Sequence, residues 1–110
     1  MEEAVREAIH RAVKKECFAR NMRMELVELE LGRSVVEMDF DPGTMTNIYD
    51  RAHGGAIFGL IDEAFETASQ THGTIAVALN VNVTYVSSPR AGSRLRAEAR
   101  ETSLTKKTAG

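Results

Sequence analysis

The stretch His53-Gly54-Gly55-Ala56-Ile57-Phe58-Gly59-Leu60-Ile61-Asp62-Glu63-Ala64-Phe65 joins a glycine turn to an apolar helix. At the helical angle of about 100° per residue, one broad apolar face forms. This face comprises Ile57, Leu60, Ile61, Ala64 and Ala68, widened by Phe58 and Phe65. The exposed strip is narrow, and we expect it to comprise Gly59, Glu63, Glu66 and Gln70. A helix with so little polar surface is expected to be buried on most sides.

Asp62 lies at the border of the apolar arc, on the same stripe as Phe58. We therefore expect its carboxyl group to be partly removed from water. The helix start is the second feature, because its first backbone N–H groups lack intrahelical partners and carry partial positive charge. Gly54 and Gly55 let a ligand approach this backbone closely, since no Cβ is in the way.

These two features together suggest a chemistry. A carbonyl-polarising helix start with a carboxylate about two turns along is what thioester or ester hydrolysis needs. The same residues also fit a structural glycine turn ahead of a buried helix, with Asp62 hydrogen-bonded locally. Helix starts bind anions in many unrelated proteins, so the pattern alone leaves both interpretations open.

The composition is that of one globular domain. The 110 residues are 43% hydrophobic and 27% charged, which permits one core and argues against disorder. The net charge of −2 gives no reason to expect nucleic acid as a partner. Residues 90–110 carry a local net charge of +4, and the remaining 89 residues carry −6. This basic end could meet a phosphorylated ligand, although a solvated strand face is the commoner explanation.

The cysteine content, the hydropathy and the N-terminal residues indicate the cellular compartment. The single cysteine, Cys17, excludes an internal disulfide and points to a reducing compartment. No apolar run approaches the ~20 residues of a membrane span, and the start Met-Glu-Glu is unlike a basic secretory signal. We expect a cytoplasmic protein with no membrane partner. No metal is expected either, because His10, His53 and His72 show no ligand spacing and Cys17 lacks a partner.

The periodicity predicts an α+β domain. Residues 1–20 contain an amphipathic N-terminal helix, with apolar residues three and four apart. Period-two patterns at 24–31 and 34–40, joined at Gly32-Arg33, predict a hairpin. The turn residues Asp41-Pro42-Gly43 end this hairpin.

The second half of the chain continues the pattern. The central helix is predicted over residues 55–71. Residues 74–88 alternate between apolar and polar side chains and form the clearest predicted strand. Residues 95–102 predict another strand with one charged face. We expect one domain over residues 1–110, in which an antiparallel sheet wraps around the central helix.

The order of the motifs carries a family resemblance. The pattern is Asn47-x5-His53-Gly54-Gly55, then Asp62, then Asn82-Val83-Thr84-Tyr85-x3-Pro89-x2-Gly92. It resembles the hotdog-fold acyl-CoA thioesterases, above all their phenylacetate-degradation (PaaI-like) branch. The likeness runs from about residue 18 to residue 107. The His-Gly-Gly sequence with an acid nine residues after the histidine is fairly specific, whereas the glycine turn alone is not.

The resemblance implies roles for four residues. The backbone N–H of Gly54, aided by Asn47, would polarise the thioester carbonyl. Asp62 would activate the attacking water or, less favourably, attack the carbonyl itself. His53 would shape the turn and contact the thioester region, or serve only as a structural cap. The resemblance also implies an acyl-CoA substrate, no cofactor, and a homodimer or a homotetramer built from two dimers, because the acid and the rest of the pocket come from opposite subunits.

The expected acyl pocket is lined by apolar helix residues and by loop residues. The predicted substrate-binding residues are Gly55, Phe58, Met45, Ile48 and Arg90, with Arg94, Lys106 and Lys107 as further candidates for the CoA phosphates.

The sequence differs from the family pattern in two respects, which limits the residue roles that the resemblance can assign. Ala78 stands where some relatives have a water-orienting Ser or Thr, so Ser69, Thr74 or Asn80 would substitute, or Asp62 would hold the water alone. One or two further strands are expected after Lys107, so either the chain is truncated or its last strand is short.

Two other functions compete with hydrolysis. A non-catalytic hotdog module would bind acyl-CoA or an acyl carrier as a ligand, but it would not need a partly buried acid near the helix start. An acyl-thioester dehydratase of the same fold would need a catalytic histidine within the helix region, whereas His53 precedes the helix.

Overall fold

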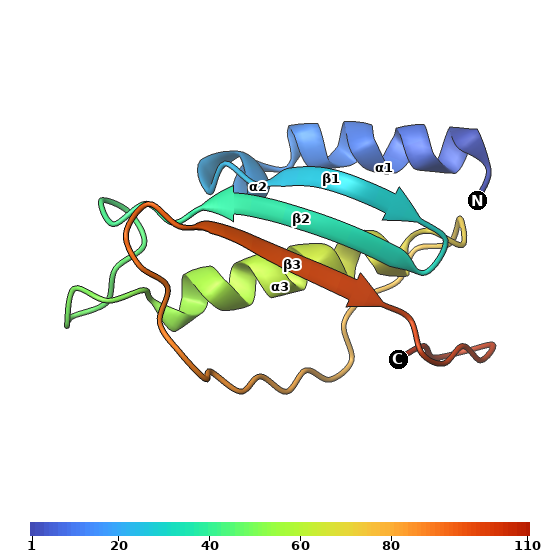
Figure 1. The fold of residues 1–110 in the computed structure, drawn as a ribbon. Helices are drawn as coiled ribbons and strands as arrows, with labels where there is room; N and C mark the ends of the chain where they lie inside the picture. The colour runs from blue at the N-terminus through green and yellow to red at the C-terminus, as the bar shows by residue number, and fades with distance from the viewer.

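The computed structural model describes residues 1–110, and its helices and strands form an α+β domain (Figure 1). The elements are α1 (Glu3–Lys15), α2 (Cys17–Asn21), β1 (Glu25–Glu30), β2 (Arg33–Asp39), α3 (Gly54–Ser69) and β3 (Arg94–Arg100). The three strands form one antiparallel sheet in the order β1-β2-β3. Helix α3 packs against β2 and β3, while α1 lies beside β1 (Figure 1). This arrangement confirms the predicted class, one long helix against an antiparallel sheet.

The predicted N-terminal helix is interrupted. Glu16 separates α1 from α2 with an extended backbone, φ −71° and ψ 117°. The interruption follows Lys14 and Lys15, which interact favourably with the negative end of the α1 dipole. Ala19 of α2 is 1% exposed, so this short helix is part of the packed structure.

Helix α2 covers a side of α3 that was expected to face water. The Phe18 ring lies so close to Gly59 that a Cβ at Gly59 would be 2.6 Å from a ring atom. Gly59 is buried, and Glu63, one turn further along, is only 3% exposed. The prediction that Gly59 and Glu63 belong to the exposed strip is therefore wrong, because a distant part of the chain packs on that strip.

The β1–β2 hairpin forms where the sequence predicts it. Gly32 occupies the turn with φ +70°, a conformation that glycine adopts at no steric cost. The register shifts between Leu26 and Glu28, so Val27 is an extra residue in β1. This bulge changes which face of the sheet each side chain meets, and it explains the imperfect alternation of β1.

The core lies between α3 and the inner face of the sheet. Its ten buried members are Val13, Ala19, Met24, Val36, Met38, Phe40, Met45, Ala56, Leu60 and Ala64. A polar contact is buried beside them: Ser34 Oγ donates to the Ala64 carbonyl at 2.6 Å and accepts from Thr67 Oγ1 at 2.9 Å. This network satisfies both buried hydroxyl groups and fixes β2 against α3.

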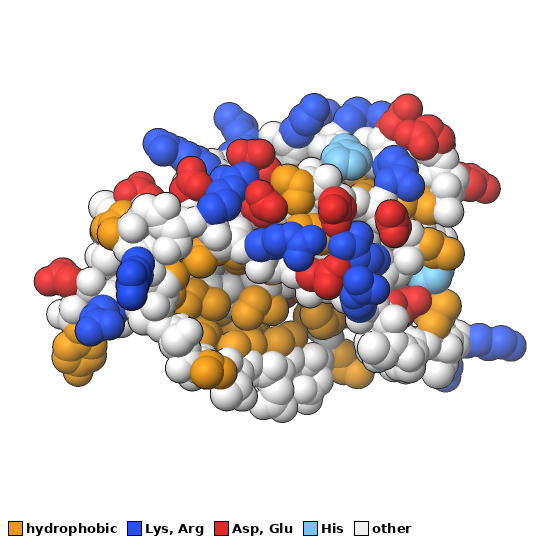
Figure 2. All heavy atoms as spheres, viewed as in Figure 1, with side chains coloured by type: hydrophobic (Ala, Val, Ile, Leu, Met, Phe, Trp, Pro, Cys, Tyr) orange, Lys and Arg blue, Asp and Glu red, His pale blue; other side chains and the backbone are white.

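Charged side chains of both signs alternate over the outer face of the sheet (Figure 2). Arg33 pairs with Glu28 at 2.7 Å and with Glu98 at 2.6 Å. Hydrogen bonds from Arg100 and Arg33 lower the pKa of Glu98. Arg94 pairs with Glu25, Glu37 and Asp39. Arg94 and Arg96 of β3 therefore meet acids of β1 and β2, as expected of a solvated strand face.

Residues 74–88 form no strand, so this prediction is wrong for the single chain. The segment runs beside α3 and pairs with no strand, although the Ala76 backbone hydrogen-bonds the Gln70 side chain (Figure 1). Its apolar side chains face water, with Ile75 94%, Val77 86% and Leu79 85% exposed. Alternation favours an extended backbone, but a strand also needs a partner for its N–H and C=O groups.

None of the three helices combines the length and the apolar character required to cross a membrane.

Candidate active site

At the start of α3, the first backbone N–H group has no hydrogen-bond partner, and the second is hydrogen-bonded by a side chain. His53 is the N-cap, and its Nδ1 accepts a hydrogen bond from the Gly55 N–H at 2.8 Å. Ala56 N–H donates to the His53 carbonyl at 3.0 Å. The Gly54 N–H makes no hydrogen bond within the chain. The cap thus leaves a single donor free at the positive end of the helix dipole.

The Tyr85 side chain packs against the start of α3. Its hydroxyl donates to the Gly54 carbonyl at 3.1 Å. A Cβ at Gly54 would be 3.4 Å from Cζ of Tyr85, so this glycine lies against the hydroxyl end of the tyrosine side chain. The sequence presented Tyr85 only as part of a motif, because the contact joins residues 31 positions apart. The structure adds it to the candidate site.

Asn47 shapes the loop before the glycine turn. Its Oδ1 accepts from the N–H groups of Tyr49 at 2.9 Å and Arg51 at 3.1 Å. Where the loop closes, His53 N–H donates to the Met45 carbonyl at 2.7 Å. The Asn47 side-chain oxygen is thus engaged in the loop, while its Nδ2 group makes no hydrogen bond and keeps both N–H donors.

Asp62 is exposed in the single chain, so the expected partial burial of its carboxyl group is wrong here. The next residue, Glu63, holds the buried carboxyl group of α3. Successive helical residues point about 100° apart, so the two acids face different surroundings. Asp62 faces solvent, and Glu63 lies beneath the N-terminal helices.

Comparison with known proteins places this geometry in a family. Residues 49–109 match the thioesterase superfamily. The chain belongs to this superfamily. Within it, the chain lies in the PaaI-like branch and has the hotdog fold, as its sequence predicts.

Three relatives illustrate the extent of the likeness to other members of the superfamily. A protein of Archaeoglobus fulgidus is 40% identical over 84 residues, which are 76% of this chain and 54% of that protein. The acyl-coenzyme A thioesterase PaaI of Escherichia coli K12 is 29% identical over 90 residues, 82% of this chain and 64% of that protein. The structure of the E. coli PaaI protein of the phenylacetic acid degradation operon superposes with a TM-score of 0.90 at 27% identity, covering 96% of this chain and 75% of that one. The chain thus spans between about half and two thirds of the curated relatives' lengths.

The other residues predicted for the thioesterase site lie in diverse surroundings. Met45 belongs to the core and is 4% exposed, whereas Ile48 is 90% exposed in the loop. Phe58 is half-buried on α3, and Gly55 and Arg90 are exposed. Gly55 lies beside His53 through the cap hydrogen bond. The substrate contacts assigned to these five residues stay predictions.

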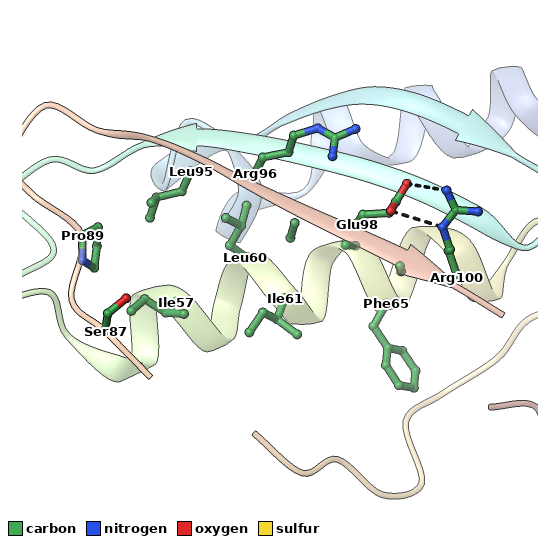
Figure 3. A pocket seen from close by; sticks show the side chains of 13 residues that line it. Ile57, Leu60, Ile61, Phe65, Ser87, Pro89, Leu95, Arg96, Glu98 and Arg100 are labelled. Atoms are coloured by element: carbon green, nitrogen blue, oxygen red, sulfur yellow. Dashed lines mark hydrogen bonds and ion pairs between the residues drawn. The ribbon is translucent and has the colours of Figure 1, made fainter. Parts of the chain in front are cut away.

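A hollow of about 580 Å³ lies between α3 and β3 (Figure 3). Ile57 and Ile61 of α3, Leu95 of β3 and Pro89 contribute to its lining. β3 pairs with β2 along one edge only, so its other edge borders this hollow. Orange apolar side chains are visible in the hollow between the sheet and the segment below it (Figure 2). The apolar lining of this hollow therefore begins at Ile57, in the first turn of α3, close to the free Gly54 N–H.

Proposed function

We propose that this protein is a thioesterase that hydrolyses an acyl-CoA with a small or aromatic acyl group. The observation that carries the proposal is the unpartnered Gly54 N–H at the start of α3, in a chain of the thioesterase superfamily. A free N–H at a helix start is suited to stabilise the negative charge that develops on a thioester oxygen. His53 keeps this donor in place by engaging the neighbouring Gly55 N–H.

The proposed reaction divides the work between two groups of residues. Gly54 N–H and Asn47 Nδ2 donate hydrogen bonds to the carbonyl oxygen as water adds to the carbonyl carbon. Asp62 takes a proton from that water. The tetrahedral intermediate then breaks its C–S bond, and the proton passes to the leaving CoA thiolate. Loss of one oxyanion donor typically costs ~10²–10³ in rate, and loss of the base ~10²–10⁴.

The active unit in this proposal is a homodimer or a homotetramer of two dimers. Asp62 is exposed in the single chain, so another subunit would have to remove it from water. Apolar residues 75, 77 and 79 and the open edge of β3 are surfaces that a second copy could cover. Light scattering on purified protein tests this assembly, and a strictly monomeric protein would contradict it.

The first experiment measures CoA release from a panel of acyl-CoA thioesters, phenylacetyl-CoA included. The variants are Asp62→Asn and a matched control, Asp39→Asn, which alters an exposed carboxylate of β2. We expect Asp62→Asn to lose at least ~10²-fold in turnover and Asp39→Asn to keep it. Equal turnover by wild type and Asp62→Asn, with unchanged oligomeric state, would refute the role of Asp62.

The second candidate is a module that binds acyl-CoA without hydrolysing it. The exposure of Asp62 favours it, because an exposed carboxylate lacks the environment that tunes a general base. Equilibrium binding of acyl-CoA by wild type, without any CoA release over the panel, would select this alternative.

A further inference from the structure

Three glutamates from two parts of the chain meet at the surface of α3. One carboxylate oxygen from each of Glu16, Glu63 and Glu66 lies within 4.8 Å of the others. Glu63 and Glu66 are three residues apart and therefore share a face of α3. Glu16 reaches them from the extended link between α1 and α2. The packing of α2 on α3 creates the cluster, which could not be recognised from sequence spacing.

No positive charge compensates this cluster. None of the three carboxylates takes part in an ion pair, although eleven ion-pair contacts occur elsewhere in the chain. Glu63 is 3% exposed, and its Oε2 is a buried side-chain oxygen without any hydrogen-bond partner. Burying an unpaired carboxylate is costly, so such a group calls for a physical explanation.

A proton is the simplest compensation. Burial, followed by the neighbouring Glu16, raises the pKa of Glu63 from 4.5 to about 9. One proton on Glu63 provides a single donor, however, and leaves two further carboxylates at the same place. A divalent cation would instead contact all three groups at once and reduce their combined charge from −3 to −1.

We propose that Glu16, Glu63 and Glu66 bind a divalent cation that prefers oxygen ligands, such as Ca²⁺ or Mn²⁺. Three carboxylates can supply up to about six oxygens, and water completes the coordination. No histidine or cysteine belongs to the cluster, so the ligand set does not favour zinc. Glu66 is exposed and gives an entry path, while the buried Glu63 provides a fixed ligand. The ion would join the α1–α2 link to α3, away from the start of α3.

The test is direct metal binding to the full chain. Metal-free protein is titrated with MnCl₂ at about pH 8, where protons compete less with the metal, and free Mn²⁺ is followed by electron paramagnetic resonance. CaCl₂ is then used to displace the Mn²⁺. We expect one site per chain and a rise of a few degrees in the unfolding midpoint with Ca²⁺ or Mn²⁺ over EDTA, because a ligand of the folded state stabilises it.

The variants separate this site from surface binding. Glu63→Gln keeps the size of the side chain and should weaken Mn²⁺ binding at least tenfold. Glu66→Gln, at the exposed side of the cluster, should weaken it too and serves if Glu63→Gln does not fold. Glu30→Gln, an exposed carboxylate of β1, is the matched control and should bind as wild type does.

Two results would overturn the proposal. The first is a wild type without saturable Mn²⁺ or Ca²⁺ binding, which would leave a proton as the only occupant of the cluster. The second is Mn²⁺ binding by both cluster variants as tight as that of wild type and Glu30→Gln, which would place the metal elsewhere on the surface.

Discussion

Replacing Gly59 by alanine tests the packing of α2 on α3. Alanine is more favourable than glycine inside a helix by about 1 kcal/mol, so an open site would gain this amount. At Gly59, however, the new Cβ would lie 2.6 and 2.9 Å from two atoms of the Phe18 ring. These separations are shorter than any normal carbon contact, so the ring has to move.

The cost of that movement follows from the burial of the ring. Phe18 is 48% exposed, so about half of its surface is covered. Full burial of a phenylalanine contributes about 1.5–3 kcal/mol, so displacing the half-buried ring costs about 0.8–1.5 kcal/mol. We therefore expect Gly59→Ala to change the free energy of unfolding little, between a gain of about 0.2 and a loss of about 0.5 kcal/mol.

A double-mutant cycle isolates the contact. In the Phe18→Ala background the obstructing ring is absent, so Gly59→Ala should stabilise the protein by about 1 kcal/mol. The coupling between the two positions is then about 0.8–1.5 kcal/mol. Urea unfolding of the four proteins, followed by far-ultraviolet circular dichroism, measures it. Equal stabilisation by Gly59→Ala in both backgrounds would show that Phe18 does not pack on Gly59.

Three further predictions follow from buried or capping groups. In EDTA, ionisation of Glu63 opposes folding between pH 4.5 and about 9, because burial raises the pKa of this group in the folded protein. The free energy of unfolding of wild type should therefore fall as pH rises through this range, by up to ~1.4 kcal/mol per pH unit. Urea unfolding at several pH values measures this dependence, and Glu63→Gln should make it weaker. A parallel profile for the variant would contradict this assignment. Ser34→Ala should cost about 0.5–1.5 kcal/mol in the free energy of unfolding, because the Ala64 carbonyl loses its hydrogen bond from the Ser34 hydroxyl, whereas the Thr67 hydroxyl still donates to the Glu63 carbonyl. The exposed control Ser87→Ala should change it by less than about 0.5 kcal/mol. His53→Ala removes the acceptor for the Gly55 N–H and should lower the thermal unfolding midpoint, at a cost of about 1 kcal/mol, whereas His53→Asn should restore most of it.

Local patterns predicted the elements of the fold. The hairpin, the central helix and β3 all lie close to their predicted ranges, because short-range periodicity records which face of an element is buried. The break at Glu16 was not predicted, although Lys14 and Lys15 mark the end of α1. The motif around His53 also located the helix start correctly, since capping depends on neighbouring residues.

The faces of α3 could be predicted only in part. The helical pattern locates the broad apolar side, which meets the sheet. It cannot tell what covers the narrow strip, because Phe18 and Glu16 approach from the start of the chain. Glycine and glutamate are usual on exposed strips, so Gly59 and Glu63 resembled solvent-facing residues. In the structure, Gly59 makes room for a ring and Glu63 joins an acidic cluster.

The two remaining differences both concern contacts that a single chain lacks. The alternation of residues 74–88 predicts a strand, yet the segment pairs with no other strand and exposes most of its apolar side chains. Asp62 has the sequence context of a partly buried acid, yet it faces solvent. A protein seldom exposes so much apolar surface without a partner for it. The proposed oligomer accounts for both features together, since one added subunit could cover the segment and remove Asp62 from water. The sequence pattern of residues 74–88 and of Asp62 is then that of residues buried between subunits, and these residues are exposed only in the isolated chain.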